Sequence, residues 1–288
     1  MPATSFQLKL QPPFKPAKPF VKWVGGKRRV IPEILDRMPA MFYNYYEPFI
    51  GGGALFFELR SMGTLSDHHI TLSDTNLRLI RTYRAVRDDI DGLIERLAEM
   101  DRKHSHTYYY AVRAWDIDKT KHDADVGAWF IYLNKTCFNG LYRVNKKNQF
   151  NSPMGRYKNP QICDEENLRI CHEQLQNVEI LHSQFDYVLN QATSEDFVYF
   201  DPPYIPVSPT ASFTAYTRDG FGLLQQSLLR DIARDLKEKG VYVMLSNSEC
   251  SLVFELYEKG FDIDVIQVGR AINSNGTKRG AVGEVLIR

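Results

Sequence analysis

Cysteine is scarce in this chain, and the few present are poorly placed for a disulfide framework or a zinc site. The four cysteines among 288 residues are Cys137, Cys163, Cys171 and Cys250. Only one further cysteine lies near the Cys171-His172 pair, so the spacing of a four-ligand zinc site is missing. The seven histidines add no convincing ligand pair. We therefore expect reduced thiols in a cytosolic protein and no metal site.

The sequence also lacks net charge and long apolar runs. Its formal charge is +1, so no global field indicates nucleic acid, and such evidence must come from local clusters. No window approaches the length of a membrane span, and the proline-rich residues 1–19 have no signal-peptide core. We expect a loose leader that becomes ordered near Phe20, and no membrane association. With 43% hydrophobic residues, the chain can form one large globular domain or one domain with an insertion.

The stretch FVYFDPPY, residues 197–204, combines a buried strand with an acid and two prolines. The apolar run is typical of a strand in a parallel sheet, and the prolines end it because they cannot donate ladder hydrogen bonds. Each proline also restricts the residue before it, which makes Asp201, Pro202 and Pro203 a stiff rim at the carboxyl end of the sheet. Open α/β sheets bind ligands at that edge. A lone Asp there would more often cap the next helix, but Asp-Pro-Pro-Tyr together is far more specific.

Three other stretches suggest a nucleoside site. In YYEPFIGGGALFFEL, residues 45–59, a strand runs into three glycines and then a helix, as tight packing or a close ligand would require. ITLSD predicts a second strand that ends in an acid about 20 residues later, where Rossmann-like proteins bind ribose hydroxyls. KWVGGKRR, residues 22–29, lacks the Ser or Thr of a P-loop. The pattern therefore favours a nucleoside cofactor without a required triphosphate.

Six motifs occur in an order that resembles the Dam family of DNA adenine-N6 methyltransferases. They are PFVKWVGGK, EPFIGGGALFF, LSDTN, NGLYRVNKKNQFNSPMGRYKNP, FVYFDPPYIP and SFTAY. The resemblance runs from about residue 20 to the carboxyl terminus, and the motif order is similar to that of the alpha group. It implies an α/β, Rossmann-like methyltransferase that uses S-adenosylmethionine to modify GATC in double-stranded DNA.

The resemblance also implies roles for individual residues. Residues of the first three motifs would bind the methyl donor, and Asp74 would hold its ribose. The sheet edge that carries Asp201 would complete the donor site. Asp201 and the Pro202 carbonyl would accept the two hydrogens of the adenine amine, Pro203 would stiffen the segment, and Tyr204 would stack on the base. The expected donor-site residues are Trp23, Gly25, Lys27, Phe49, Gly51, Gly53, Asp74 and Asp201.

The chemistry of the adenine amine supports this assignment. Its lone pair is delocalised into the ring, so two fixed acceptors would favour the tetrahedral geometry needed for attack. The target base would first have to leave the helix stack. Because a sulfonium donor is already activated, neither a nucleophilic side chain nor a metal is required, and we expect direct in-line transfer by positioning and oriented dipoles.

The chain between the two strand ends near Ile50 and Phe200 is too long for ordinary crossovers. In a methyltransferase-like sheet those ends would be adjacent, across the point where the strand order reverses, and we expect the intervening chain to hold a mainly helical insertion. Helical periodicity covers residues 77–100, and residues 128–137 are also predicted to be helical. The expected organisation is a leader at 1–19, a catalytic domain formed by 20–75 and 164–288, and a target-recognition insertion at 76–163.

A basic and aromatic segment lies inside the insertion. Residues 136–162 hold five basic residues and no acid, a composition compatible with DNA recognition and equally with a solvated loop. The resemblance favours DNA: Arg143 would read a guanine, Lys22 the first guanine, and Phe138 would enter the duplex beside the flipped base. The full set of expected DNA-binding residues is Lys22, Phe138, Asn139, Leu141, Arg143, Lys146 and Arg156.

Some features depart from the family or leave alternatives. Ser183 and Gln184 stand where many relatives have an acid, so donor contacts there stay open. A polar loop with Asn273, Ser274 and Asn275 resembles a segment near the active site, and is equally compatible with a simple turn. RNA or a protein amide is a second substrate class, and a DNA-binding regulator without turnover a third hypothesis. The leading hypothesis is the DNA adenine methyltransferase. It would be a cytoplasmic enzyme, encoded by a bacterium or a phage, that is paired in function with a restriction endonuclease or acts alone.

Overall fold

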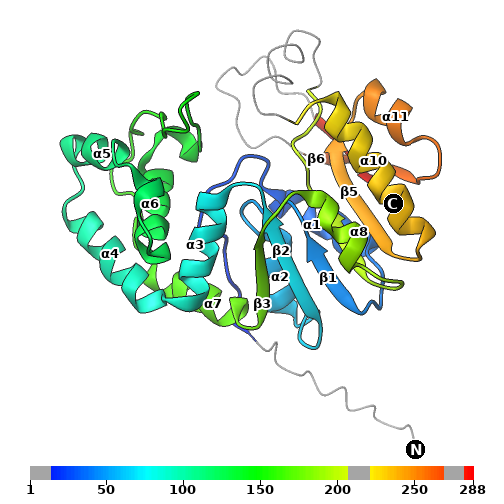
Figure 1. The fold of residues 1–288 in the computed structure, drawn as a ribbon, viewed down its shortest axis with the longest axis horizontal. Coiled ribbons are helices and arrows are strands. Elements are labelled where there is room, and N and C mark those ends of the chain that lie inside the picture. Colours follow the sequence, from blue (N-terminus) through cyan, green and yellow to red (C-terminus); the bar gives the residue numbers. More distant parts are fainter. Residues whose placement is uncertain (1–13, 207–220, 269–281) are drawn as a thin grey trace, which may run out of the picture.

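The computed structural model describes residues 14–206, 221–268 and 282–288, and within them a seven-stranded sheet forms the centre of the fold (Figure 1). The strand order is β3-β2-β1-β4-β5-β7-β6. β7 is antiparallel to both of its neighbours, and the other pairs are parallel. The strands are β1 (Asn44–Glu47), β2 (His69–Asp74), β3 (Val178–His182), β4 (Phe197–Phe200), β5 (Tyr242–Ser248), β6 (Ile263–Val268) and β7 (Val282–Ile287). This mixed sheet, typical of S-adenosylmethionine-dependent methyltransferases, agrees with the expected α/β class.

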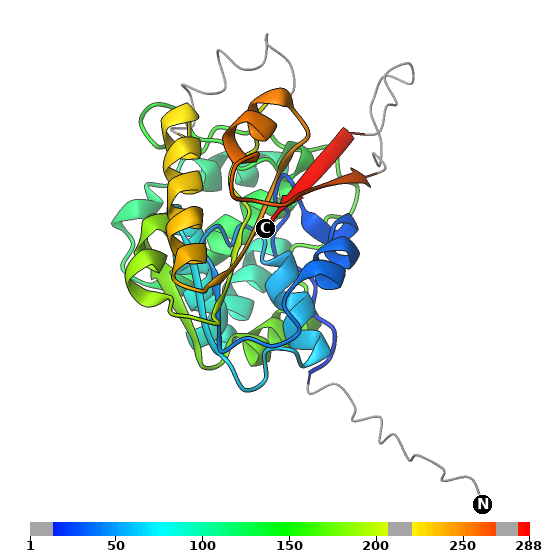
Figure 2. The same ribbon diagram turned by 90° about the vertical axis from the view of Figure 1, so that its right-hand side faces the viewer.

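Alternating apolar side chains bury both faces of the sheet. Tyr45 and Phe197 belong to one core cluster, whereas their chain neighbours Tyr46 and Val198 belong to the other. Helices cover the two faces, with α10 on one side of the sheet and the blue helices α1 and α2 on the other (Figure 2). The helices outside the region between α3 and α7 are α1 (Ile31–Arg37), α2 (Ala54–Met62), α8 (Val188–Gln191), α10 (Leu223–Glu238) and α11 (Ser251–Tyr257), and that region is bounded by α3 (Leu77–Asp88) and α7 (Glu165–Leu175).

The central strands β1 and β4 pair directly, as expected from the sequence. Tyr45 is opposite Phe197 and Tyr46 is opposite Val198, although about 150 residues separate them in the chain. β1 also pairs with β2, and β4 with β5, so the strand order reverses between β1 and β4. Such a switch point opens the carboxyl edge of the sheet to ligands. The glycine turn, Asp74 and Asp201 all lie at this edge.

The chain between β2 and α7 forms a helical region, which begins with α3 beside the sheet and extends away from it (Figure 1). It contains α3, α4 (Ile90–Arg102), α5 (His106–Arg113) and α6 (Asp123–Thr136), with short 3-10 turns at Ile117–Lys119 and Phe138–Gly140. The predicted helical stretch at 77–100 is divided at Asp89, whose carboxylate accepts the Gly92 amide of α4 at 3.2 Å. α6 begins at Asp123, five residues before the predicted start.

Helix α3 belongs structurally to both parts of the molecule. It contacts β2 and β3 on one side and α6 on the other, and one core cluster runs from the sheet through α3 into α6. The insertion limits of 76–163 therefore stay a prediction, because its first helix is also a helix of the sheet layer.

The described amino-terminal segment is bound to the fold earlier than expected. Gln174 donates to the Lys15 carbonyl at 2.8 Å, and the Lys18 amide donates to Asn167 at 2.8 Å. The chain is thus held from residue 15, before Phe20. Within the described ranges, no helix combines the length and apolarity needed to cross a membrane.

The carboxyl-terminal part of the chain completes the sheet. α10 packs against β5, and β6 and β7 form an antiparallel pair. The SFTAY motif and the loop with Asn273, Ser274 and Asn275 lie outside the described residues.

Candidate active site

The glycine turn joins β1 to α2 and is enclosed by two aromatic side chains. Gly51 has φ +46°, and a Cβ there would lie 2.6 Å from Cδ1 of Trp23. Gly53 has φ +69°, and a Cβ there would lie 2.6 Å from the Tyr83 hydroxyl. That hydroxyl donates to the Gly51 carbonyl at 3.1 Å. Both positions therefore require glycine for conformation and for space, and the supporting contact from Tyr83 of α3 was not predicted from the sequence.

Asp74 lies beside this turn at the end of β2. Its carboxylate accepts the Gly51 amide at 3.3 Å and the Asn76 amide at 2.9 Å. Burial raises the pKa of Asp74 despite these bonds. Further along the edge, Phe49 stacks on Phe185 with ring centroids 5.4 Å apart. Phe185 begins the 3-10 turn Phe185–Tyr187, directly after Gln184.

A buried lysine joins the KWVGGK and DPPY segments. Lys27 is 4% exposed, and its Nζ lies 2.8 Å from Asp201 Oδ1 and 3.9 Å from Glu284 Oε2. The same nitrogen lies 4.2 Å from the centroid of the Tyr204 ring and donates to the Gly25 carbonyl at 3.2 Å. Gly25 has φ +82°, which bends the chain so that its carbonyl faces the lysine. The structure thus brings together residues from both ends of the chain.

The local environment sets the charge states of this cluster. Burial raises the pKa of Asp201 to about 6, while the Lys27 cation opposes the rise. Burial and the neighbouring carboxylates hold the pKa of Tyr204 well above its usual value, so its hydroxyl stays protonated and donates to Glu284 Oε2 at 2.8 Å. Near neutral pH the cluster therefore presents an ionised Asp201 and a neutral Tyr204.

The DPPY segment is held by hydrogen bonds from α10 and from β5. Pro202 is buried, and the Pro203 carbonyl accepts Gln226 Nε2 of α10 at 2.9 Å. The Ile205 amide donates to Asn247 of β5 at 3.1 Å. These bonds, with the fixed φ of the prolines, hold the acceptors at the strand end.

Two acids of this site escaped the sequence analysis. Glu284 lies in β7, and Glu47, 3% exposed at the end of β1, accepts the Tyr45 hydroxyl at 2.7 Å. Burial raises the pKa of Glu47 to about 8. Both acids could have been found from the sequence, because each is a single acid inside an apolar run, YYEPFI for Glu47 and GEVLI for Glu284. An acid in such a run is expected to be buried and therefore to need a partner.

Trp23 connects the glycine turn to the predicted recognition segment. Its indole stacks on Tyr142 and Phe130, with centroid distances of 6.2 and 6.4 Å. The backbone of Lys22 next to it exchanges hydrogen bonds with the Asn134 side chain, at 2.7 and 2.8 Å. Lys22 Nζ lies 4.0 Å from the centroid of the Tyr157 ring. The end of α6 and its following loop therefore pack directly beside the donor-site motif.

The other predicted DNA-binding residues occupy this loop and its surface. Phe138 is 50% and Leu141 38% exposed, which leaves two apolar side chains facing solvent. Asn139 has φ +54°, and Arg143 donates to Asn151 Oδ1 at 2.8 Å. Lys146 and Arg156 are exposed. The segment is a folded hairpin-like loop, closed by bridges that join Cys137 to Met154 and Val144 to Phe150.

The predicted donor-site residues lie together along one sheet edge. The glycine turn, the Asp74 carboxylate and the Phe49–Phe185 pair occupy this edge next to Asp201. The described residues include no group of three or more His, Cys, Asp or Glu side chains that could hold a metal ion.

Comparison with known proteins agrees with this geometry. A model of the D12 class of N6 adenine-specific DNA methyltransferases matches residues 23–272. The chain is 44% identical to the type II methyltransferase M1.LlaDCHI of Lactococcus lactis subsp. cremoris over 276 residues, which cover 94% of each chain. It is 43% identical to the type II methyltransferase M.MjaIII of Methanocaldococcus jannaschii, over 91% of this chain and 95% of the relative. It is 34% identical to the DNA adenine methylase of Escherichia coli K12, over 94% and 95% of the two chains.

These matches span nearly the whole chain and include relatives well above 30% identity. They decide against RNA or a protein amide as the substrate class, and against a regulator without turnover. Family membership implies DNA as the substrate and S-adenosylmethionine as the methyl donor. The protein is an adenine-specific DNA methyltransferase and belongs to the D12 class of N6 adenine-specific enzymes.

Proposed function

We propose that this enzyme methylates the adenine of GATC in double-stranded DNA, after flipping the base, by direct in-line transfer. The observation that carries the mechanism is the position of Asp201, a largely buried carboxylate paired with Lys27 at 2.8 Å on the same sheet edge as Asp74 and the glycine turn. A carboxylate fixed by a buried cation can accept a hydrogen from an amine without moving.

Asp201 and the Pro202 carbonyl would hold the two hydrogens of the flipped adenine. This contact directs the nitrogen lone pair away from the ring and toward the methyl group. Tyr204, fixed by Glu284 and Lys27, would support the base by stacking. The mechanism uses positioning and needs no covalent enzyme intermediate.

The donor-site residues would bind the cofactor in a fixed orientation. Bound S-adenosylmethionine supplies a methyl group already activated by its sulfonium. Asp74 would accept hydrogen bonds from the ribose hydroxyls, the turn at Gly51 and Gly53 would allow close approach, and Trp23, Gly25 and Lys27 would close the site. Phe49, next to Phe185, would line its adenine end. We expect no metal to take part.

The hairpin-like loop at 137–154 would read the DNA, together with Lys22. Phe138 and Leu141 present exposed apolar side chains that suit insertion beside the extruded base, with Asn139 between them. Arg143 would read a guanine, and Lys146 and Arg156 would contact phosphates. Relatives named DNA adenine methylase, at 33 to 34% identity, support the adenine chemistry, whereas GATC as the site rests on the resemblance of the motifs to the Dam family.

The two type II relatives favour a functional pairing with a restriction endonuclease. At 43 to 44% identity they resemble this chain more than those DNA adenine methylases do. We propose that the enzyme protects the sites of such a nuclease in the cytoplasm, without forming a stable complex with it.

Methyl transfer from labelled S-adenosylmethionine to short duplexes tests the proposed specificity. We expect transfer to a GATC duplex and about 5- to 150-fold less to GATG, since a mismatched base pair costs about 1–3 kcal/mol, and still less to a duplex with no site. Equal transfer to GATC and GATG would reject GATC as the site. It would not affect the assignment as an adenine methyltransferase.

Replacing Arg143 with alanine is expected to lower the preference for the cognate duplex by about 5- to 150-fold, the range of one lost bidentate base contact. The ratio of kcat/KM on the preferred duplex and on a one-base variant measures this. Lys146→Ala, in the same loop, is the matched control and should weaken both duplexes alike. If Arg143→Ala also weakens both alike, Arg143 contacts phosphate and reads no base.

A further inference from the structure

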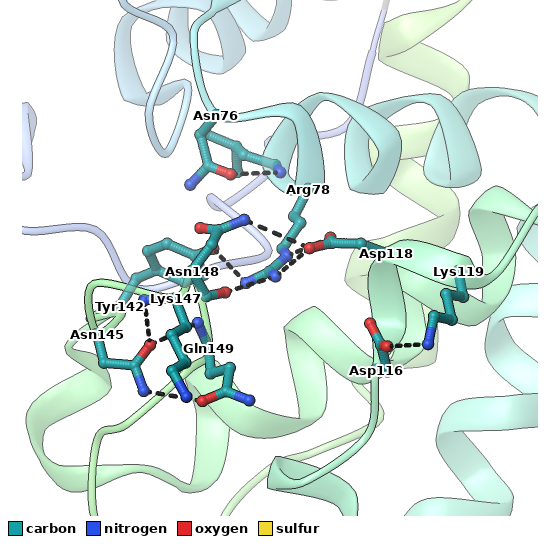
Figure 3. Close-up of polar contacts among 11 residues, drawn as sticks. Asn76, Arg78, Asp116, Asp118, Lys119, Tyr142, Asn145, Lys147, Asn148 and Gln149 are labelled. Carbon is teal, nitrogen blue, oxygen red and sulfur yellow. Dashed lines mark hydrogen bonds and ion pairs between the residues drawn. The ribbon is translucent and has the colours of Figure 1, made fainter.

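Arg78 of α3 is a buried cation with an unusually complete set of partners. Only 7% of the residue is exposed. Its Nε and Nη2 donate to the two carboxylate oxygens of Asp118 at 2.7 and 2.6 Å, a bidentate pair (Figure 3). Bidentate pairing fixes the plane of the guanidinium as well as its charge. Arg78 is therefore held rigidly, and its remaining donors point in fixed directions.

Those remaining donors bind the predicted DNA-reading loop. Nη2 donates to the backbone carbonyl of Asn148 at 2.7 Å, and Nη1 donates to the Tyr142 hydroxyl at 3.2 Å (Figure 3). Asn148 has φ +56° and lies at the tip of the loop. Around it, Asn145 Oδ1 accepts the amides of Lys147 and Gln149 at 2.9 and 3.0 Å. The loop is thus ordered internally by Asn145 and tied to the body of the enzyme by Arg78.

The same contacts lead to the donor site. Tyr142 stacks on Trp23, which packs against Gly51 of the glycine turn. At the start of α3, the side chain of Asn76 caps the helix by accepting the Leu79 amide at 3.2 Å. The backbone amide of Asn76 donates to the Asp74 carboxylate. Arg78 is the second residue of α3, four residues after Asp74. Its side chain therefore joins the start of α3 to the tip of the loop.

We propose that Arg78 is a positioning residue for sequence discrimination, which fixes the loop that carries Arg143 relative to the active-site edge, with Asp118 as its anchor. The inference rests on the proposed role of the loop in reading DNA. Arg78 touches neither donor nor reacting atoms. It acts by limiting the orientations in which the loop can meet the base edges, so its loss reduces preference for the cognate site more than it reduces donor binding.

Arg81 provides a matched control on the same helix. Its Nε lies 2.6 Å from Asp123 of α6, so it also joins α3 to the helical region through a largely buried ion pair. No described contact connects Arg81 to the loop. Loss of this pair measures the general cost of removing an α3 ion pair.

The test compares Arg78→Met and Arg81→Met in the full-length enzyme. For each variant, kcat and KM are measured on the duplex that the wild type prefers and on a one-base variant, and donor affinity is measured by calorimetry without DNA. We expect Arg78→Met to raise KM for the preferred duplex and lower the discrimination ratio by on the order of ten- to a hundredfold, as a small misplacement can. The donor Kd of Arg78→Met should stay within about threefold of the wild-type value. Arg81→Met should change neither the discrimination ratio nor the donor Kd by more than about threefold.

Two further variants test the geometry of the contact. Arg78→Lys keeps the charge but cannot make the bidentate fork, so discrimination should stay low. Asn148→Gly keeps the backbone carbonyl that Arg78 binds and suits its positive φ. It removes only the side-chain bond from Asn148 Nδ2 to Asp118 Oδ2 at 3.3 Å, so discrimination should stay within about threefold of the wild type, as expected for a weak exposed contact. If Arg78→Met does not fold, Asp118→Asn at the partly exposed end of the pair should show the same change in smaller degree.

Each other outcome is decisive. Wild-type discrimination in Arg78→Met, or restored discrimination in Arg78→Lys, overturns the proposal. A parallel loss of donor affinity and of melting temperature, beyond that of Arg81→Met, shows a general structural role and also overturns it. If Arg143→Ala leaves discrimination unchanged as well, the proposed role of the loop in reading DNA fails, and the assignment of the reaction is not affected. If Arg143→Ala lowers discrimination and Arg78→Met does not, only the proposed positioning role of Arg78 fails.

Discussion

Replacing Asp201 with alanine is expected to reduce the rate of methyl transfer by about a hundred- to a thousandfold, the usual effect of removing one preorganised polar group from a reacting centre. The carboxylate would no longer accept an amine hydrogen, so the nitrogen lone pair would stay delocalised in the ring. Single-turnover transfer on a cognate duplex, with saturating donor and enzyme, measures this chemical step directly.

The control for this substitution is Asp186→Ala. Asp186 is an exposed acid near the same edge, just after β3, and its removal should leave the rate unchanged. Donor affinity of Asp201→Ala, measured by calorimetry, separates lost chemistry from lost binding. A single-turnover rate within about tenfold of the wild type, with donor bound, would remove Asp201 from the catalytic role.

The rate should depend on pH through the ionisation of Asp201. Its pKa is raised to about 6, chiefly by burial, and the ionised carboxylate accepts the amine hydrogen much more strongly than the protonated acid does. Single-turnover transfer should therefore be low below pH 6, rise through about pH 6 and level off above it. The stability effect runs in the opposite direction. The pKa in the folded protein lies above that of an aspartate in the unfolded chain, about 4, so the contribution of this group to stability is lost as pH rises from about 4 through 6.

Lys27→Met is expected to move the midpoint of that pH profile upward. The Lys27 cation, 2.8 Å from Asp201, lowers the carboxyl pKa, whereas Glu284 raises it, so removing the cation leaves only effects that favour protonation. Moving the midpoint by about one pH unit corresponds to about 1.4 kcal/mol between the two protonation states. Near pH 7 the variant should then lose activity that higher pH recovers. This recovery distinguishes a changed pKa from a lost donor contact.

Arg29→Met is the matched control, because Arg29 belongs to the same 3-10 turn, Lys27–Arg29, and is exposed. Its profile should keep the wild-type midpoint. An unchanged midpoint in Lys27→Met would show that the ionisation seen in the profile belongs to another group, of which the buried Glu47 is the first candidate.

The sequence by itself determined the elements that carry the chemistry. Local patterns are sufficient for these, because prolines end a strand, glycines permit positive φ, and alternation marks buried strands. The glycine turn after β1, Asp74 at the end of β2 and Asp201 after β4 all occur as predicted, and pairing of β1 with β4 followed from the resemblance to a methyltransferase sheet. The split of residues 77–100 at Asp89 was missed, because the apolar periodicity continues through a capping residue.

Only the tertiary structure decided which side chains act together. Lys27 pairs with Asp201 and approaches Glu284 across most of the chain, and Arg78 reaches Asp118 and Asn148. No local pattern specifies such contacts, since a lysine or arginine reads as an exposed charge until burial requires a partner for it. The physical reason is that folding removes water from these charges, and the partner that replaces water is fixed by packing between distant segments rather than by their sequence.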